Sequence, residues 1–79
     1  MKVTVFLYGT FRERFKDYRH HKGLDVELPT EALATDILSA VGISTESGAV
    51  VIQNGRILKM DETVKDGTSF NIMQSIAGG

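Results

Sequence analysis

The residues of this chain that could carry chemistry are few, and most of them stand alone. Cysteine is absent from the 79 residues, which excludes a disulfide framework, a thiolate metal site and a cysteine nucleophile. His20 and His21 are adjacent, so on a helix their side chains would diverge by about 100°, and no carboxylates nearby complete a metal site. We expect an exposed polar pair here and no bound metal.

Serine and glycine are common, yet neither forms a catalytic motif. No serine lies in the frame of a nucleophile elbow, and no glycines form a P-loop or a dinucleotide fingerprint. A chain this short also has little room for a cleft that buries a substrate. We therefore expect no enzymatic activity from the chain by itself.

The most distinctive group is the closing segment Ser75-Ile76-Ala77-Gly78-Gly79. Glycine has no Cβ and permits unusual backbone angles, so a glycine pair can be drawn into a narrow channel with backbone close on all sides. A terminal glycine also leaves its carbonyl carbon open to attack. These properties suit activation of the Gly79 carboxylate by another enzyme, with Gly78 needed for threading. The alternative is an inert tail.

Charge is unevenly distributed, although the net charge is only −1. Between Gly9 and Gly23 the chain has two acidic residues and five basic ones, namely Arg12, Arg14, Lys16, Arg19 and Lys22. From Leu24 to Asp66 it has three basic and eight acidic residues. A solvated surface is the plain interpretation of the basic segment Arg12–Lys22, and docking to a charged partner is the alternative. The isoelectric point of about 6.0 argues against a nucleic-acid partner.

The sequence has no feature of a membrane or secreted protein. No apolar run approaches the roughly 20 residues of a membrane-spanning helix, and Met1 leads directly into a strand pattern with no signal peptide. Without cysteines, packing alone must hold the domain together, which suits the cytoplasm. We expect a cytoplasmic protein with no membrane partner.

Strands are predicted by period-2 alternation or by short apolar runs at residues 2–8, 24–28, 48–53, 56–59 and 68–74. Asn54-Gly55 predicts a tight hairpin turn, because both residues tolerate a positive φ. Asp66-Gly67 predicts a second turn. Three aromatic residues at helical spacing predict a short amphipathic turn after the first strand, with the rings in the core: Phe11, Phe15 and Tyr18.

The main helix is expected to open at Pro29-Thr30, with Thr30 as the capping residue and Glu31 in the first turn. Gly42 is the expected stop. One apolar stripe at helical spacing would pack on the sheet: Leu33, Ala34, Ile37, Leu38 and Val41.

This order of elements predicts an α+β fold of the β-grasp (ubiquitin-like) type. An amino-terminal hairpin, one main helix packed across the sheet and a closing strand beside the first strand would form a mixed sheet of four to five strands. We expect a β-grasp domain over residues 1–74 and a flexible Gly-Gly tail over residues 75–79.

Several segments, in order and spacing, resemble the MoaD/ThiS family of ubiquitin-like sulfur carriers, which includes the small subunit of molybdopterin synthase. They are residues 3–7 with 11–13, residues 35–38 with 42–43, residues 51–55, Asp66-Gly67 and the closing residues 76–79. The chain departs from the family at Thr68, where an acid is common, and at Gln74-Ser75, where prolines are frequent.

The resemblance implies a cycle of activation and sulfur transfer. An E1-like adenylating enzyme of the MoeB/ThiF type would use ATP to convert the Gly79 carboxylate to an acyl-adenylate. A sulfur nucleophile would then give a covalent thiocarboxylate, which donates sulfur in a MoaE-like synthase large subunit. The chain itself would bind no cofactor.

Docking to these partners is expected on the sheet face away from the helix. If Val3, Val5 and Leu7 enter the core, then Phe6 and Tyr8 point outward near Met73, and they could anchor an interface together with Ile76 and Ala77. The alternative is that Phe6 or Tyr8 packs under the segment around Phe11.

The product of the pathway stays open at this stage. Molybdopterin is favoured by the Ala-Gly-Gly ending and the chain length. Thiamine, a tungsten-pterin cofactor and thiolated tRNA are alternatives, as is a ubiquitin-like modifier joined through Gly79 to lysines of target proteins. An interaction module with an inert tail is the last alternative.

Overall fold

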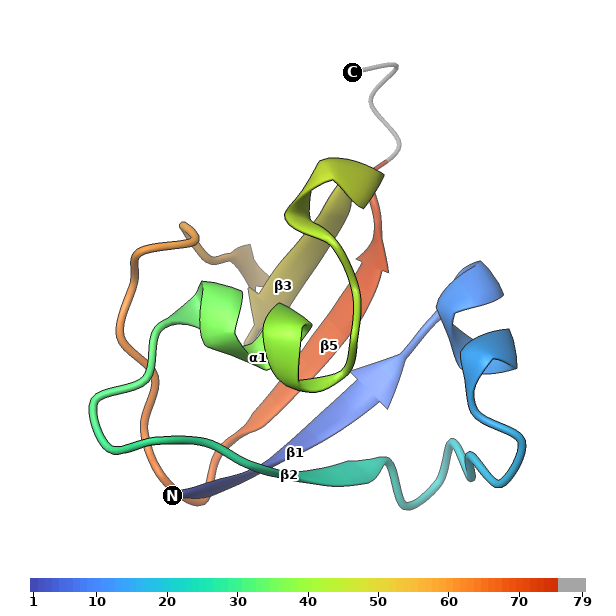
Figure 1. Cartoon of the computed structure of the whole chain (residues 1–79), viewed down its shortest axis with the longest axis horizontal. Coiled ribbons are helices and arrows are strands. Elements are labelled where there is room, and N and C mark those ends of the chain that lie inside the picture. Colours follow the sequence, from blue (N-terminus) through green and yellow to red (C-terminus); the bar gives the residue numbers. More distant parts are fainter. Residues whose placement is uncertain (76–79) are drawn as a thin grey trace.

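A five-stranded mixed sheet forms the centre of the computed structural model, which describes residues 1–75 (Figure 1). The strand order is β2-β1-β5-β3-β4. The strands have the bounds β1 Lys2–Leu7, β2 Leu24–Glu27, β3 Ala49–Gln53, β4 Arg56–Ile57 and β5 Ser69–Gln74. One α-helix, α1 (Ala34–Ala40), lies across one face of this sheet.

The first and last strands of the chain pair in the middle of the sheet. β1 and β5 run parallel, with Val5 opposite Phe70 and Leu7 opposite Ile72. Their other neighbours, β2 and β3, are antiparallel to them. The predicted β-grasp arrangement is therefore confirmed, with the amino-terminal hairpin on one side and the β3–β4 hairpin on the other.

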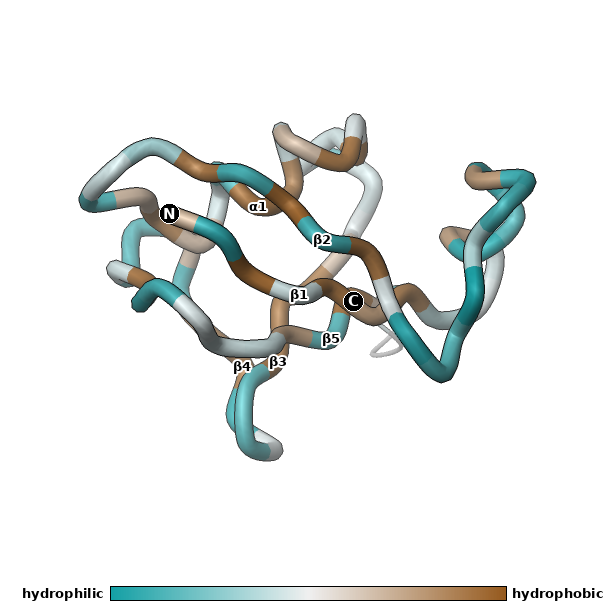
Figure 2. The backbone as a smooth tube through the Cα atoms, turned by 90° about the horizontal axis from the view of Figure 1, so that it is seen from below, coloured by the Kyte–Doolittle hydropathy of each residue, from teal (hydrophilic) through white to brown (hydrophobic). Residues whose placement is uncertain are grey.

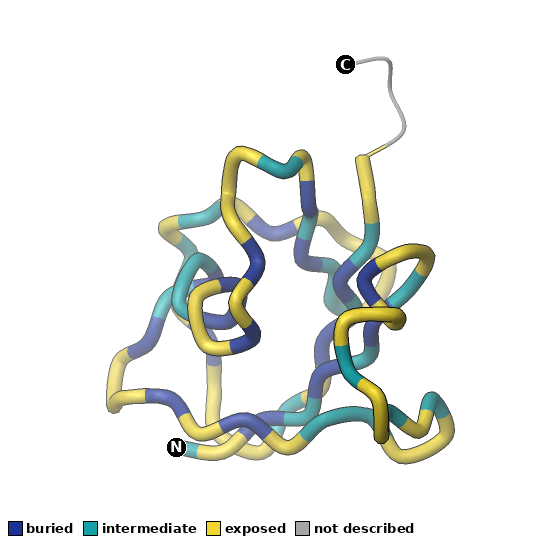
Figure 3. The backbone as a smooth tube through the Cα atoms, turned by 45° about the vertical axis from the view of Figure 1, so that its right-hand side comes forward, coloured by how far each residue is buried: buried dark blue, intermediate teal, exposed yellow. Residues whose placement is uncertain are grey.

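The core lies between this sheet and α1 (Figure 3). Val3, Val5 and Leu7 of β1 are buried, as their alternation predicts, and the intervening side chains are not. The other large side chains that are fully buried are Phe70 and Ile72 of β5, Ile37 and Leu38 of α1, and Val51 of β3. Each such side chain contributes about 1.5–3 kcal/mol by leaving water.

The predicted start of the main helix is wrong. The helix begins at Ala34 after an N-cap at Leu33, whose N–H donates to the Asp36 carboxylate at 2.7 Å. Thr30 does not cap it, and Glu31 has a positive φ of 65°. The helix ends as predicted, since Gly42 follows with φ 74°.

Long-range backbone bonds explain the late start. The segment before α1 pairs with the loop that precedes β5, through a bridge between Leu33 and Thr63. Val64 N–H donates to Ala32 O at 3.0 Å, and Ala34 N–H donates to Glu62 O at 2.9 Å. Residues that would have formed the first helical turn are thus held in an extended path by a part of the chain about thirty residues away.

The two hairpins of the sheet have very different connections. Asn54 and Gly55 form the tight β3–β4 turn with φ 53° and 77°, as predicted. β4 is shorter than expected and ends at Ile57, although the buried Leu58 still donates its N–H to Val51 O at 2.8 Å. Between β1 and β2, residues 8–23 form a long connection that begins with the 3-10 helix Gly9–Arg14. We call residues 8–23 the β1–β2 connection.

The predicted aromatic turn in the β1–β2 connection is confirmed only in part. The 3-10 helix ends at Arg14, and Phe15 is extended, with φ −123° and ψ 112°. Phe11 is buried in the core, whereas Phe15 and Tyr18 pack against it partly exposed. No helix among residues 1–75 has the length and apolar character needed to cross a membrane.

Candidate partner-binding surface

The sheet face opposite α1 carries the side chains that the sequence places on its outer side. Phe6 and Tyr8 alternate with the buried residues of β1, and Met73 follows Ile72 on β5. All three are partly exposed. Tyr8 N–H donates to Ile72 O at 3.0 Å, which continues the β1–β5 ladder and sets Tyr8 beside the strand that carries Met73. These side chains therefore point away from the core, as the alternation predicts.

His20 covers part of this surface. Its ring meets Tyr8 edge-to-face at a centroid distance of 4.8 Å and Phe6 at 6.0 Å. Edge-to-face contacts of this kind are favourable because the ring edge is positive and the ring face negative. The expectation of two exposed histidines is wrong for His20, which is partly buried, while His21 is exposed. The alternative of packing under the segment around Phe11 holds in part, since His20 of the same connection lies edge-to-face against both rings while Phe6 and Tyr8 stay partly exposed.

The Tyr18 side chain hydrogen-bonds the end of β1, where β2 no longer pairs with it. The backbone groups of Leu7 face the side occupied by β2, but β2 reaches only as far as the pair Val5–Leu24. The phenol oxygen of Tyr18 accepts from Leu7 N–H at 2.8 Å and lies 3.4 Å from Leu7 O. Unpaired backbone groups are costly away from water, so this phenol stabilises the strand end and ties the β1–β2 connection to the sheet.

His20 completes the contact from the other side. Its Nδ1 lies 2.8 Å from the Tyr18 phenol oxygen. In the tautomer with its proton on Nε2, His20 accepts the phenol proton at Nδ1; with the proton on Nδ1 it donates to the phenol oxygen, and the phenol proton can then point to Leu7 O. The anchor of the β1–β2 connection is therefore compatible with either tautomer of the imidazole.

Gly23 lets the connection return to the sheet. Its φ is +71°, and a Cβ at this position would lie 2.9 Å from Val5 O and 3.0 Å from the Phe6 ring and from the Thr4 methyl group. Only glycine fits such a left-handed position against a neighbouring backbone. The turn delivers Leu24 to its place opposite Val5.

A hollow of about 460 Å³ opens on the β1–β2 connection. It is lined by Gly9, Arg12, Glu13, Phe15, Lys16 and Tyr18. The Arg12 guanidinium lies 5.9 Å from the centre of the Tyr18 ring, within range of a cation–π contact. Within residues 1–75, no three His, Asp or Glu side chains gather closely enough to hold a metal ion.

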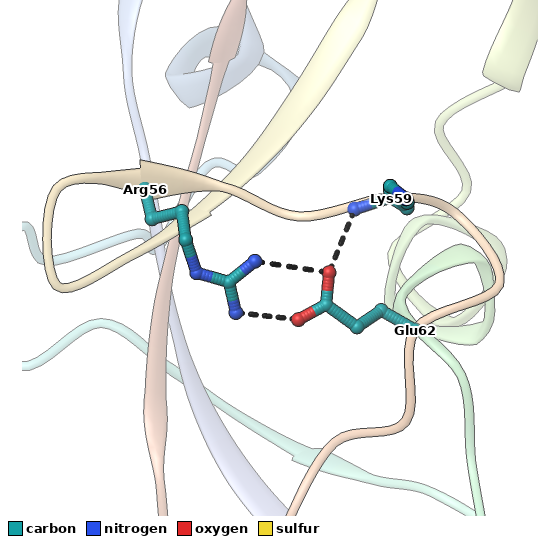
Figure 4. A network of polar contacts seen from close by, with 3 residues as sticks. All are labelled: Arg56, Lys59 and Glu62. Atoms are coloured by element: carbon teal, nitrogen blue, oxygen red, sulfur yellow. Dashed lines mark hydrogen bonds and ion pairs between the residues drawn. The ribbon is translucent and has the colours of Figure 1, made fainter.

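The opposite edge of the sheet is closed by a charged contact (Figure 4). Arg56 of β4 donates through both guanidinium nitrogens to the Glu62 carboxylate, and Lys59 N–H donates to the same carboxylate at 3.1 Å. The hydrogen bond from Arg56, and then that from Lys59, lowers the pKa of Glu62 to about 2. This contact fixes the loop after β4 without leaving either charge free.

The predicted tail residues Ile76, Ala77, Gly78 and Gly79 lie outside the described residues. The last described residue, Ser75, was assigned to the tail, and its N–H donates to Gly48 O at 2.8 Å. The chain therefore reaches residue 75 beside the start of β3 and two residues beyond Met73.

Sequence reasoning missed the roles of Tyr18 and His20. The sequence predicts Tyr18 in the core and His20 in solvent, but the two form one unit with Leu7, Phe6 and Tyr8. No local pattern identifies such a unit, because its partners lie on a strand that precedes them by eleven to fourteen residues.

No protein-family profile matches the sequence. Among solved structures, the chain is similar to SAMP1 from Haloferax volcanii, with a TM-score of 0.73 and 17% sequence identity over 100% of both chains. At 17% sequence identity this similarity supports a shared fold and nothing further. It agrees with the strand order above, and the chain has the ubiquitin-like β-grasp fold.

Proposed function

We propose that this chain is a ubiquitin-like sulfur carrier whose reacting group is the carboxylate of Gly79. The observation that carries the proposal is the position of β5. This strand lies in the middle of a β-grasp sheet, and the sequence places Gly78-Gly79 four residues after its end at Gln74. A rigid body followed closely by a glycine pair suits delivery of a chain end into another protein's active site.

The chemistry belongs mainly to the partners. In an E1-like enzyme of the MoeB/ThiF type, a Gly79 carboxylate oxygen attacks the α-phosphorus of ATP and pyrophosphate leaves. A sulfide equivalent then attacks the carbonyl carbon of the acyl-adenylate, and AMP leaves with the bonding electrons. The resulting thiocarboxylate sulfur is the group transferred. The carrier supplies the reacting atom and its recognition, and the partner supplies orientation and charge stabilisation.

The acceptor we propose is a synthase large subunit of the MoaE kind, with molybdopterin as the product, in the cytoplasm. The Ala77-Gly78-Gly79 ending and the chain length support this choice. Phe6, Tyr8 and Met73 would meet the partners on the outer face of the sheet, with Ile76 and Ala77 in the channel that receives the tail.

Protein modification is the second candidate. SAMP1, the structural neighbour, is a ubiquitin-like small archaeal modifier protein. Both functions begin with adenylation of Gly79, and they differ in the nucleophile that follows. A modifier would form amide bonds to lysines and so give conjugates of higher mass, whereas a carrier would give a free thiocarboxylate.

Intact mass of the protein recovered from its own cells tests the proposal. Replacement of one terminal oxygen by sulfur raises the mass, and alkylation should locate the added sulfur on Gly79. Alkylation is essential because oxidation of a methionine, such as Met60 or Met73, changes the mass by nearly the same amount. Recovery of only the plain carboxylate from cells that are making the cofactor contradicts the carrier function, and lysine-linked conjugates favour the modifier.

Deletion of Gly79 tests the reacting group directly. ATP–pyrophosphate exchange by the activating enzyme of the same cell should be lost, while the urea midpoint should stay unchanged because the buried core of the described residues is formed by residues 3–72. Exchange that continues at the wild-type rate would show that Gly79 is not the activated residue.

Alanine at Phe6 tests the outer face as the recognition surface. The variant should raise the KM for the carrier in this exchange by about tenfold, as expected for an interface anchor. Ile57→Ala is the matched control, because Ile57 is 60% exposed on β4 at the far edge of the sheet. Equal effects of the two variants would remove Phe6 from the proposed interface.

A further inference from the structure

We propose that the β1–β2 connection is a docking surface for a carboxylate-rich patch on a partner protein. The proposal concerns recognition alone, so it goes beyond the Gly79 chemistry and stands or falls separately from it. Figure 2 shows the connection as a hydrophilic loop that projects beyond the end of the sheet.

The positive charge of this loop is not neutralised by ion pairs among the described residues. Arg12, Arg14, Lys16, Arg19 and Lys22 are all exposed. No carboxylate among residues 1–75 forms an ion pair with any of them, whereas Arg56 at the other edge is paired with Glu62. The loop therefore presents a concentrated positive field, which attracts an acidic surface and orients its approach.

Two of the arginines are already held in place. Arg14 donates to Gly42 O at 3.2 Å, and its guanidinium lies 5.7 Å from the centre of the Phe11 ring. Arg12 lies over the Tyr18 ring. Binding through side chains that are already ordered loses less conformational entropy, and the planar guanidinium matches a carboxylate in two-point contact.

The backbone beneath these charges is also fixed. Tyr18 binds both the N–H of Leu7 and the ring of His20, and Gly23 returns the chain to the sheet. His20 in turn contacts Phe6 and Tyr8. The basic loop and the partly exposed aromatic residues thus form one continuous surface, with the apolar centre and polar rim typical of protein interfaces.

The remainder of the chain disfavours a nucleic acid as the occupant. Residues 24–66 contain eight acidic and three basic residues, which would repel a long polyanion that extends beyond the loop. Phe11 is buried, and Phe15 and Tyr18 are partly buried against the core with Arg12 over the Tyr18 ring, which leaves little ring surface for base stacking. A compact acidic patch on a protein would contact only the basic loop and so would avoid the acidic remainder of the chain.

A second copy of the chain fits the loop poorly. Several of its carboxylates are already engaged: Asp36 accepts from Leu33 N–H, Glu62 from Arg56, and Asp66 from Lys2 N–H. The other exposed carboxylates of residues 24–66 are spread over separate elements: Asp25 and Glu27 on β2, Glu31 before α1, Glu46 in the 3-10 helix Thr45–Ser47 and Asp61 after β4. The occupant we infer is therefore a different protein.

Backbone amide mapping by NMR tests the proposal with a synthetic glutamate-rich peptide that has leucine at its centre. We expect saturable shifts at residues 12–22 together with Tyr8 and Met73, and weaker binding as salt is added. A matched peptide with glutamine in place of every glutamate should bind at least about tenfold more weakly, since the charged contacts are lost.

The charge-reversal pair Arg19→Glu and Lys22→Glu should weaken binding of the acidic peptide by about tenfold or more. The matched control reverses Lys59 and Lys65, which are also exposed but lie after β4, and should change binding by less than about twofold. Equal effects of the two pairs, or equal binding of the glutamine peptide, overturn the proposal. Tighter binding of a single-stranded oligothymidylate than of the acidic peptide assigns the loop to nucleic acid, and self-association without any probe assigns it to a second copy.

Discussion

The two hairpins of the sheet are joined in opposite ways. Asn54 and Gly55 close the turn of the β3–β4 hairpin by their own backbone preferences. The β1–β2 connection has no such local solution and is held by side chains that reach back to β1, above all Tyr18 and His20. One connection is determined by two residues and the other by contacts that form only in the folded protein.

The same difference extends to charge. At the β3–β4 hairpin the cation Arg56 is bound by Glu62, so the charge of this arginine is neutralised within the fold. In the β1–β2 connection the long-range contacts involve aromatic residues and backbone, and the cations remain at the surface. A loop that is anchored by its aromatic residues can be both well ordered and rich in unpaired charge, which is the combination that a recognition surface needs.

The largest expected effect is that of alanine at Gly23. The left-handed backbone costs about 1–2 kcal/mol for a residue with a Cβ, and the contact with Val5 O adds to this because strand backbone cannot move aside. Gly9→Ala is the matched control, since Gly9 has φ +61° with no atom within 4 Å of the added Cβ. The urea midpoint should fall further for Gly23→Ala than for Gly9→Ala. Equal losses would mean that the close approach to β1 adds nothing.

Removal of the Tyr18 hydroxyl should have the next largest effect. Tyr18→Phe leaves Leu7 N–H without its partner and frees Nδ1 of His20, so the free energy of unfolding should fall by about 1–3 kcal/mol. Tyr8→Phe removes the same group from a neighbouring ring that has no hydrogen bond of its own among the described contacts. Urea unfolding of both variants gives the comparison. A loss no larger than that of Tyr8→Phe would show that water satisfies Leu7 equally well.

The sequence contains enough local information for one connection and too little for the other. The strand alternation of Val3, Val5 and Leu7, the Asn54-Gly55 turn and the stop at Gly42 each depend on neighbouring residues, and all are confirmed. The helix start is wrong because backbone bonds to residues 60–64 compete with the first turn. Such competition cannot be seen in a window of adjacent residues.

The candidate site also has one part that neighbouring residues determine and one part that distant contacts determine. Alternation along β1 was enough to place Phe6 and Tyr8 on the outer face. The covering of both rings by His20 depends on how residues 15–23 fold back, which is decided by Tyr18 meeting Leu7 and by Gly23 fitting against β1. The predicted tail contacts of Ile76, Ala77, Gly78 and Gly79 stay predictions.

A smaller effect is expected for the turn that needs no distant partner. Gly55→Ala should lower the free energy of unfolding by about 1–2 kcal/mol through its left-handed φ of 77°, with no close contact added. Gly55→Asn should recover much of this loss, because asparagine tolerates that region. Amide shifts should change only around residues 53–57 and leave the β1–β2 connection unaltered. Changes that spread to Tyr18 or His20 would contradict the independence of the two hairpins.

The smallest effect concerns the Glu62 carboxylate, and it depends on pH. Its pKa falls from 4.5 in the unfolded chain to about 2 in the fold, so the folded state binds the proton less well. The stabilisation is complete above about pH 4.5 and is lost as the pH falls toward about 2. Glu62→Gln should therefore reduce the fall of the urea midpoint between about pH 4.5 and about pH 2. The reduction should be modest because the pair is exposed to solvent. Glu27→Gln on β2 is the control, and added salt should weaken the difference between the two. A fall of the urea midpoint at low pH that Glu62→Gln leaves unchanged would mean that the Arg56–Glu62 pair does not stabilise the β3–β4 edge, and that the Asn54-Gly55 turn and packing suffice there.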